Sequence, residues 1–433
     1  MKKNLLSKNI HQWLLLLVCF VATLPLWAED CTEDGIIYDI NTSTNTATVK
    51  GLEDKSATSA KIKNSVAGCE VTSIGHEAFY LCRSLTSINI PSSVTSIDRD
   101  AFSFCSSLTS INIPSSVTSI ASGAFSYCSS LTSINIPSSV TSIGEYVFSG
   151  CRSLTSINIP SSVTSIASGA FSDCSSLTSI NIPSSVTSIG EFVFSGCISL
   201  TSINIPSSVT SIASGAFSDC SSLTSVNIPS SVTIIGSFAF SGCSSLTSVN
   251  IPSSVTSIER DAFSRCSSLT SVNIPSSVTS IERDAFQYCS SLTSVNIPSS
   301  VTSIGVYAFR GCSSLTSINI PSSVTNIISS AFRGCSALIA FTVDANNPNY
   351  SAEGCMLFNK EKTTLIVAVG SEKTYDIPSS VTSIDGYAFR GCSALTSINI
   401  PSSVTSIGDD AFENCIYNHR TTKTNQKYPS VNL

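Results

Sequence analysis

A unit of 23 residues repeats along most of this 433-residue chain and limits what it can fold into. Six successive cysteines mark the interval, and they are Cys105, Cys128, Cys151, Cys174, Cys197 and Cys220. Self-similarity at a period of about 20 to 50 residues indicates a repeat architecture. The few apolar side chains of one unit cannot offset the entropy lost in ordering its residues. Stacked units cover one another's apolar faces, so we expect the units to fold only as a stack.

The apolar pattern within a unit predicts short strands and turns. In a typical unit, Ile111 and Ile113 alternate with polar residues, as in a strand, and the proline that follows ends this strand. Residues 117–120 form a second short extended run. Residues 121–128 form a turn or one helical turn that brings Phe125 into the core. We therefore predict an all-β-dominated repeat solenoid of 23-residue units with short parallel strands and little helix.

The complete frame of the unit resembles a known class of repeat. The frame reads L-x-x-I-x-I-P-x-x-V-x-x-I-x-x-x-A-F-x-x-C-x-x-L, and it recurs from about Cys69 to Cys415. It is similar to the BspA-like class of leucine-rich repeats. The resemblance implies a curved solenoid of parallel strands, display on a cell surface, and adhesion to host or microbial partners. It implies no catalytic residues.

The chain divides into four segments by sequence pattern. We expect a signal peptide at residues 1–28, an N-terminal cap at 29–68, the leucine-rich repeat solenoid at 69–416, and a polar, disordered tail at 417–433. Within the solenoid, residues 341–377 break the frame. We interpret them as one irregular, longer coil with a hairpin, whose strands lie near residues 356–358 and 364–369.

The N-terminal segment has the features of a secretory signal. Three lysines precede an apolar run from Trp13 to Leu24, and Ala28 is a suitable residue before a cleavage site. A membrane anchor is the alternative, but the run is short and Pro25 interrupts it. We predict an exported protein, extracellular or at the cell surface, with no transmembrane segment in the mature chain.

Composition restricts the partners and the chemistry. Charged residues make up 12% of the chain, against an average of about 25%, and the sequence shows no basic patch. We therefore expect protein partners, such as extracellular matrix or other cell-surface components, and no nucleic acid. The mature chain offers only His76 and His419 as histidines, and no convergent catalytic set surrounds either of them. We expect no enzymatic activity, no cofactor and no metal site.

The cysteines allow two interpretations. Fourteen of the 18 lie on the repeat frame. Export favours disulfides, yet neighbouring coils should lie about 4.7–4.9 Å apart, whereas bridged β-carbons lie about 3.8 Å apart. We predict mostly buried free thiols, with a bridged ladder as the alternative. Cys31, Cys69 and Cys355 lie off the ladder, and a Cys31–Cys69 bridge in the cap stays open.

Asparagine recurs between two core positions of each regular coil. The row comprises Asn89, Asn112, Asn135, Asn158, Asn181, Asn204, Asn227, Asn250, Asn273, Asn296 and Asn319. These side chains should face away from the core. We expect their amides to stack as a hydrogen-bonded ladder that stiffens the sheet.

Variation between the coils concentrates on the turn before the core phenylalanine. Our candidate partner-binding ridge comprises Tyr146, Phe192, Phe238, Arg260, Arg283, Tyr307 and Tyr387. Aromatic residues and arginine are enriched at interface hot spots, which favours adhesion through this ridge. Alternatively, the aromatic residues only cover the coil edges. The corresponding alternative function is a passive structural spacer of the cell surface without a specific ligand.

Overall fold

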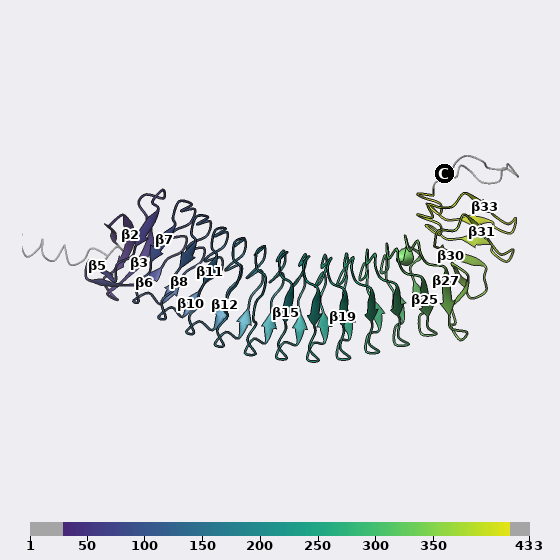
Figure 1. Cartoon of the computed structure of the whole chain (residues 1–433), viewed down its shortest axis with the longest axis horizontal. Helices are drawn as coiled ribbons and strands as arrows, with labels where there is room; N and C mark the ends of the chain where they lie inside the picture. Colours follow the sequence, from purple (N-terminus) through teal and green to yellow (C-terminus); the bar gives the residue numbers. More distant parts are fainter. Residues whose placement is uncertain (1–28, 416–433) are drawn as a thin grey trace, which may run out of the picture.

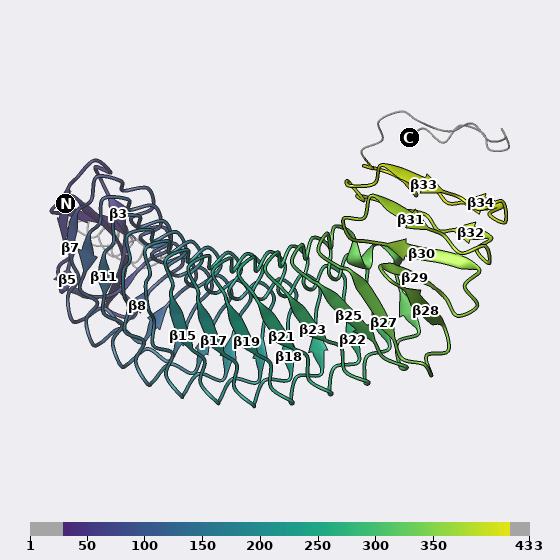
Figure 2. The ribbon, with the colours of Figure 1, turned by 45° about the vertical axis from the view of Figure 1, so that its right-hand side comes forward.

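The chain forms a long, arc-shaped β-solenoid, as Figures 1 and 2 show. The computed structural model describes residues 29–415, so the predicted signal peptide and polar tail lie outside the described residues. The solenoid has about 16 turns of about 23 residues each and essentially no helix, which confirms the predicted fold class. Within residues 29–415, the one helical element is the 3₁₀ turn η1 (Ser329–Phe332).

An antiparallel sheet stands at the N-terminal end of the solenoid. Its elements are β1 (Glu29–Glu33), β2 (Ile36–Asn41), β3 (Thr46–Leu52), β5 (Ser65–Val66) and β6 (Cys69–Ile74). The short strand β4 (Ser59–Lys61) instead pairs parallel with β7 (Ser87–Asn89). Strands β1, β2 and β3 pair antiparallel, and β3 then pairs parallel with β6. The side chain of Tyr38 is fully buried in this segment. The sheet thus covers the apolar face that the first coil would otherwise expose.

Most coils contribute one short strand to each of two rows, and in the coils of Asn158 and Asn181 the first row consists of isolated bridges only. The asparagine-bearing row contains β7 (Ser87–Asn89), β9 (Ser110–Ile111), β11 (Ser133–Ile134), β15 (Ser202–Asn204), β17 (Ser225–Asn227), β19 (Ser248–Asn250), β21 (Ser271–Asn273), β23 (Ser294–Asn296), β25 (Ser317–Ile320), β27 (Ala340–Val343), β31 (Thr374–Asp376) and β33 (Ser397–Asn399). Pairing is parallel and in register, so that Val226 lies opposite Val249 and Asn227 opposite Asn250.

The second row follows the proline of each coil. It contains β8 (Ser96–Ile97), β10 (Ser119–Ile120), β12 (Ser142–Ile143), β13 (Ser165–Ile166), β14 (Ser188–Ile189), β16 (Ser211–Ile212), β18 (Ile234–Ile235), β20 (Ser257–Ile258), β22 (Ser280–Ile281), β24 (Ser303–Ile304), β26 (Asn326–Ile327), β32 (Ser383–Ile384) and β34 (Ser406–Ile407). The second residue of each strand is an isoleucine that points inward and is buried, or partly buried at Ile407, whereas the residue before it is wholly or partly exposed. The two rows therefore enclose one continuous core.

A ladder of phenylalanine rings runs through this core. One buried ring per coil, from Phe79 to Phe332, stacks almost parallel on the next, with centroids 5.0 to 5.8 Å apart. The interval equals one coil, so each ring contacts both neighbouring units. The core is thus built from contacts between units, which agrees with the expectation that a single unit does not fold alone.

The frame cysteines lie beside the ring ladder as free thiols. From Cys105 to Cys335, each S–H group donates to the carbonyl of the phenylalanine in the preceding coil, as Cys243 does to Phe217 at 3.2 Å. All cysteines of residues 29–415 are free, including Cys31 and Cys69, so the bridge considered for the cap is not formed. Burial raises the pKa of the Cys128 thiol to about 12.

Hydroxyl groups, and not amides, form the side-chain ladders on the surface. Threonine hydroxyls donate to the carbonyl of the equivalent threonine one coil earlier, as Thr132 does to Thr109 at 3.2 Å. The asparagines are exposed, as expected. However, no amide-to-amide bond joins the asparagine side chains of the described coils, so the predicted amide ladder is wrong. The shorter serine and threonine side chains can reach the neighbouring backbone directly.

One coil near the C-terminal end is longer than the others. Its strands β28 (Tyr350–Glu353), β29 (Met356–Asn359) and β30 (Thr364–Ala368) pair antiparallel, and β30 continues the second row by pairing parallel with β32. The fully buried Asn347 donates to the carbonyls of Pro321 and Val324 at 2.8 and 3.0 Å. These bonds attach the longer coil to the preceding regular one.

Candidate functional site

The predicted aromatic residues fall on one line along the solenoid. Tyr146, Phe192, Phe238, Tyr307 and Tyr387 share one position of the frame, and all have a left-handed backbone, with φ between 54° and 65°. We call this line of equivalent positions the aromatic ridge. Arg260 and Arg283 stand one residue before the same position in their own coils. The structure therefore brings all seven predicted residues onto one edge of the solenoid.

The left-handed backbone lets this turn bond to the next coil. The N–H groups of Tyr146, Phe148 and Gly150 donate to carbonyls of the following coil at 3.0, 2.8 and 2.7 Å. A left-handed residue other than glycine costs about 1–2 kcal/mol, so the bonds it permits must offset that cost. The ridge side chains consequently project from a turn that is fixed to its neighbour.

Glycine alternates with aromatic residues along part of the ridge. Gly169 follows Tyr146 one coil later, and Gly215 follows Phe192. A β-carbon on either glycine would collide with the aromatic ring of the preceding coil, so each ring lies directly over a glycine. Residues 121–166 and 167–212 are nearly identical in sequence, and the pairing of ring with glycine gives a physical reason for this repeat of two coils. The rings still project, with 49% of Tyr146, 42% of Phe192 and 36% of Phe238 exposed.

Charged pairs occupy the middle of the ridge. Arg260 lies over the Phe238 ring, with its Cζ atom 5.6 Å from the ring centroid, and its Nε atom lies 3.0 Å from Asp261. Arg283 and Asp284 form the same pair at 2.9 Å. Burial, followed by the nearby charge of Asp284, raises the pKa of the Asp261 carboxyl. Both arginines remain half exposed, so their guanidinium groups are oriented yet accessible.

A second ridge runs parallel to the first, four residues further along each coil. Its side chains include Phe104, Tyr127, Asp173, Asp219, Arg265 and Tyr288, and their φ values lie between 55° and 61°. Glycines alternate here as well, and a β-carbon on Gly150 would collide with the Tyr127 ring. This ridge was not predicted from the sequence. The alternation of glycine with large residues at a fixed frame position was the signal that could have revealed it.

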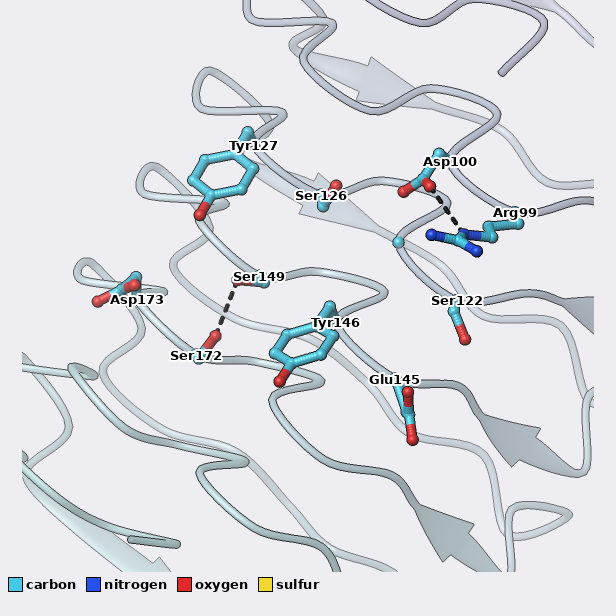
Figure 3. Close-up of a pocket in the computed structure, with 11 residues that line it drawn as sticks. Arg99, Asp100, Ser122, Ser126, Tyr127, Glu145, Tyr146, Ser149, Ser172 and Asp173 are labelled. Carbon is cyan, nitrogen blue, oxygen red and sulfur yellow. Dashed lines mark hydrogen bonds and ion pairs between the residues drawn. The ribbon is translucent and has the colours of Figure 1, made fainter. Parts of the chain in front are cut away.

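A row of serines forms the floor between the two ridges. Their hydroxyls bond in pairs across neighbouring coils, Ser103 with Ser126 at 2.7 Å and Ser149 with Ser172 at 2.8 Å. At the N-terminal end, this groove widens to a depression of about 580 Å³. Figure 3 shows Tyr127 and Asp173 on one side of the depression and Asp100 and Tyr146 on the other.

One cluster of the kind that can hold a metal lies at the start of the aromatic ridge. Within residues 29–415, ligand-type atoms of His76, Glu77 and Asp100 lie within 4.8 Å of one another. These groups already have protein partners, because the His76 Nδ1 atom lies 3.0 Å from the Arg99 carbonyl and the Asp100 carboxylate pairs with the Arg99 side chain. Glu77 in turn lies 3.6 Å from the His76 ring, so each of the three groups has a protein partner.

Comparison with known proteins identifies the repeat. The family model described as "BspA type Leucine rich repeat region (6 copies)" matches residues 52–178, 164–293, 279–363 and 370–431. These matches span most of the chain. No curated protein matches the sequence.

Solved structures of bacterial leucine-rich repeat proteins share the architecture. A leucine-rich repeat protein from Bacteroides ovatus is 32% identical, with 90% of this chain and 93% of that chain covered at a TM-score of 0.69. A leucine rich cell surface protein from Faecalibacterium prausnitzii is also 32% identical, with 73% and 95% covered at a TM-score of 0.52.

These similarities agree with the fold and with the kind of surface described above. The repeat is a protein-interaction scaffold, and no catalytic family is indicated. Within residues 29–415, no helix has the length and apolar character needed to cross a membrane. Since the repeat model spans most of the sequence and the regular coils carry its frame, the chain belongs to the BspA-type leucine-rich repeat family.

Proposed function

We propose that this protein is exported, stays outside the cell or at its surface, and adheres to protein partners through the aromatic ridge. The observation that carries the proposal is the line of half-exposed aromatic rings fixed on turns that are bonded coil to coil. Rigid aromatic side chains lose little conformational entropy when they bind. The Faecalibacterium prausnitzii relative is described as a cell surface protein, which supports the proposed location.

The ridge is a better candidate for partner choice than the asparagine row. The row repeats one side chain in coil after coil, so it can recognise only a repetitive partner or bind weakly at many points. In contrast, the ridge presents different aromatic and charged side chains in different coils. Such variation gives a protein partner a distinct pattern of anchors, and tyrosine and arginine are enriched among binding hot spots.

A passive spacer is the second candidate, and one observation favours it. The rings of Tyr146 and Phe192 each lie over a glycine of the next coil, so these rings contribute to packing along the coil edge. If packing is their whole role, their replacement should change stability and leave adhesion unchanged. The two functions therefore make opposite predictions for variants of the same residues.

The test replaces Tyr146, Phe192 and Phe238 together by serine. A matched control replaces Asn135, Asn181 and Asn227 by serine, which changes three exposed positions in nearby coils. Binding to extracellular matrix proteins and to neighbouring cells is measured after circular dichroism has established that both variants are folded. We expect at least about a tenfold loss of adhesion for the ridge variant, because each hot-spot truncation costs about 2 kcal/mol or more. Undiminished adhesion of the ridge variant together with loss in the control would refute the proposal.

Export has its own test. If the signal acts as proposed, N-terminal sequencing of protein recovered outside the cell should begin at Glu29. Recovery of an intact Met1 end, retained in the cytoplasm, would contradict export without bearing on the ridge.

A further inference from the structure

The side chains on the floor of the groove change from serine to arginine toward the C-terminal end. Eight coils place serine at the floor position, from Ser103 to Ser264. Later coils place Arg310, Arg333 and Arg390 at the same position. Because these arginines are far apart in the sequence, no basic patch was recognised there. The fold gathers them at one place beside the longer coil.

The longer coil explains how Arg333 reaches Arg390. The Cys392 thiol contacts the Ala368 carbonyl, which therefore takes the place of a core phenylalanine carbonyl. Only two residues separate Leu365 from Ala368, whereas four separate Ile384 from Phe389 in the next coil. The longer coil therefore lacks the ridge turn, and the next residue, the buried Val369, takes the floor position. Across this gap, a β-carbon on Gly391 would lie only 3.9 Å from the Arg333 Nε atom.

Tyrosine rings orient two of the three guanidinium groups. The Cζ atom of Arg310 lies 5.2 Å from the Tyr288 centroid and 5.0 Å from that of Tyr307. The Cζ atom of Arg390 lies 4.8 Å from the Tyr387 centroid. Because cation–π contacts use the ring faces, the N–H edges of these arginines remain directed away from the rings.

The cluster holds more positive than negative charge. Glu413 pairs with Arg390, with Nε to Oε2 at 2.5 Å, and no carboxylate within residues 29–415 pairs with Arg310 or Arg333. Burial, followed by the charges of Arg390 and Arg310, lowers the pKa of the Arg333 guanidinium. Three guanidinium groups thus share one carboxylate in a protein whose net charge is −6. This unbalanced cluster differs from the paired arginines on the middle of the ridge.

We propose that Arg310, Arg333 and Arg390 bind an acidic, extended segment of a protein partner through its carboxylates. The inference rests on the proposed protein-binding function and adds the chemistry of the partner. Guanidinium groups bind carboxylates through two parallel hydrogen bonds. Along the solenoid, neighbouring coils are 5.7 Å apart here, measured between the Phe309 and Phe332 rings. Alternate side chains of an extended peptide repeat at about 6.6 Å, so acidic residues two positions apart suit Arg310 and Arg333. The longer coil lies between Arg333 and Arg390, so the acidic residue that meets Arg390 stands further along the peptide, again at an alternate position.

A sulfated sugar fits the site less well. Sugars bind by stacking on aromatic faces as well as by charge, and here arginines occupy faces of Tyr288, Tyr307 and Tyr387. Backbone groups of an extended peptide can also bond to the exposed parts of the groove without using a ring face. The acidic peptide is therefore the occupant that the geometry favours.

The test measures binding of a fluorescein-labelled peptide of alternating glutamate and serine to the full chain by fluorescence anisotropy. Arg333→Gln should weaken binding about tenfold, since one charge-assisted pair is lost. Arg333→Lys keeps the charge but loses the planar fork, so its affinity should fall between those of Arg333→Gln and the unaltered chain. Arg152→Gln is the matched control, because it removes the same charge at an exposed position several coils away and should leave affinity unchanged.

Several results would overturn the inference. Equal losses of peptide affinity in Arg333→Gln and Arg152→Gln would indicate general charge attraction. No measurable binding of the peptide by the unaltered chain would show that the three arginines do not form such a site. Tighter, Arg333-dependent binding of a sulfated oligosaccharide than of the peptide would show that the class of partner is wrong. The adhesion assay with the ridge serine variant is independent, because that variant retains all three arginines. Failure of the peptide assay is thus distinguishable from failure of adhesion.

Discussion

Replacement of Phe217 by alanine tests the stacked core most sharply. The ring is fully buried between those of Phe194 and Phe240, with centroids 5.5 and 5.3 Å away. Its backbone N–H donates to the Ala239 carbonyl at 2.8 Å, and its carbonyl accepts the Cys243 thiol. These bonds hold the neighbouring coils at their spacing, so the cavity left by the ring cannot close easily.

The structure therefore predicts that Phe217→Ala lowers the free energy of unfolding by an amount at the upper end of the range known for such changes. Phenylalanine-to-alanine changes in cores cost about 3–5 kcal/mol, and sites that cannot relax lose the most. We expect about 4–5 kcal/mol for Phe217→Ala, because both flanking interfaces lose the ring. Phe217→Leu keeps most of the volume and loses the aromatic stacking, so it should cost about 1–2 kcal/mol. Asn204→Ser, on the exposed row of the same coil, should cost below about 0.5 kcal/mol.

Urea unfolding followed by far-UV circular dichroism measures these three variants. The expected order of destabilisation is alanine first, leucine second and the asparagine variant last. Removal of a core side chain from a central coil can also let the N-terminal and C-terminal halves of the solenoid unfold separately. For Phe217→Ala this would appear as a second unfolding transition or a lower m-value. Equal losses from Phe217→Ala and Asn204→Ser would refute the assignment of inside and outside.

Two further predictions concern the thiols and the ridge glycines. Because the pKa of Cys128 rises from 9.0 to about 12 on folding, its contribution to the free energy of unfolding is complete below pH 9 and is lost as the pH rises toward 12. Thiol titration should accordingly be slow in native buffer and fast in denaturant; rapid native labelling would contradict the buried ladder. Gly169→Ala should cost about 1–3 kcal/mol more than Gly68→Ala, since both glycines are left-handed but only Gly169 lies under a ring. Adding Tyr146→Ser should recover that excess in a double-mutant cycle, and strict additivity would contradict the proposed contact.

The repeated coil could be predicted from the sequence because each frame position has the same structural role in every coil. Ile111, Phe125 and Cys128 recur at a fixed interval beside polar residues, so periodicity alone indicates which side chains face the core. The aromatic ridge followed from the place where the coils differ. The strands near residues 356–358 and 364–369 followed from apolar runs around a polar turn, and β29 and β30 are present there.

Features that depend on backbone conformation or on contacts between coils could not be predicted. Tyr127 and Asp173 give no local sign of a left-handed backbone, so the second ridge was missed. The amide ladder failed because a row of identical side chains indicates exposure without fixing their bonding partners. Arg333 lies beside Gly391, the neighbour of Arg390, because the intervening coil lacks a ridge turn, and that omission becomes evident only when the coils are aligned in space.

Hydroxyl-radical footprinting of the ridge during adhesion tests the central claim most directly. Tyr146, Phe192 and Phe238 are reactive, exposed aromatic reporters, and Ile339, which is 70% exposed, is an internal control away from the ridge. Oxidation is compared by mass spectrometry between free protein and protein bound to its target cells or matrix. The account predicts several-fold protection of the three ridge residues in the bound state, with Ile339 unchanged. Equal oxidation of the ridge in both states, with protection elsewhere on the solenoid, would contradict it.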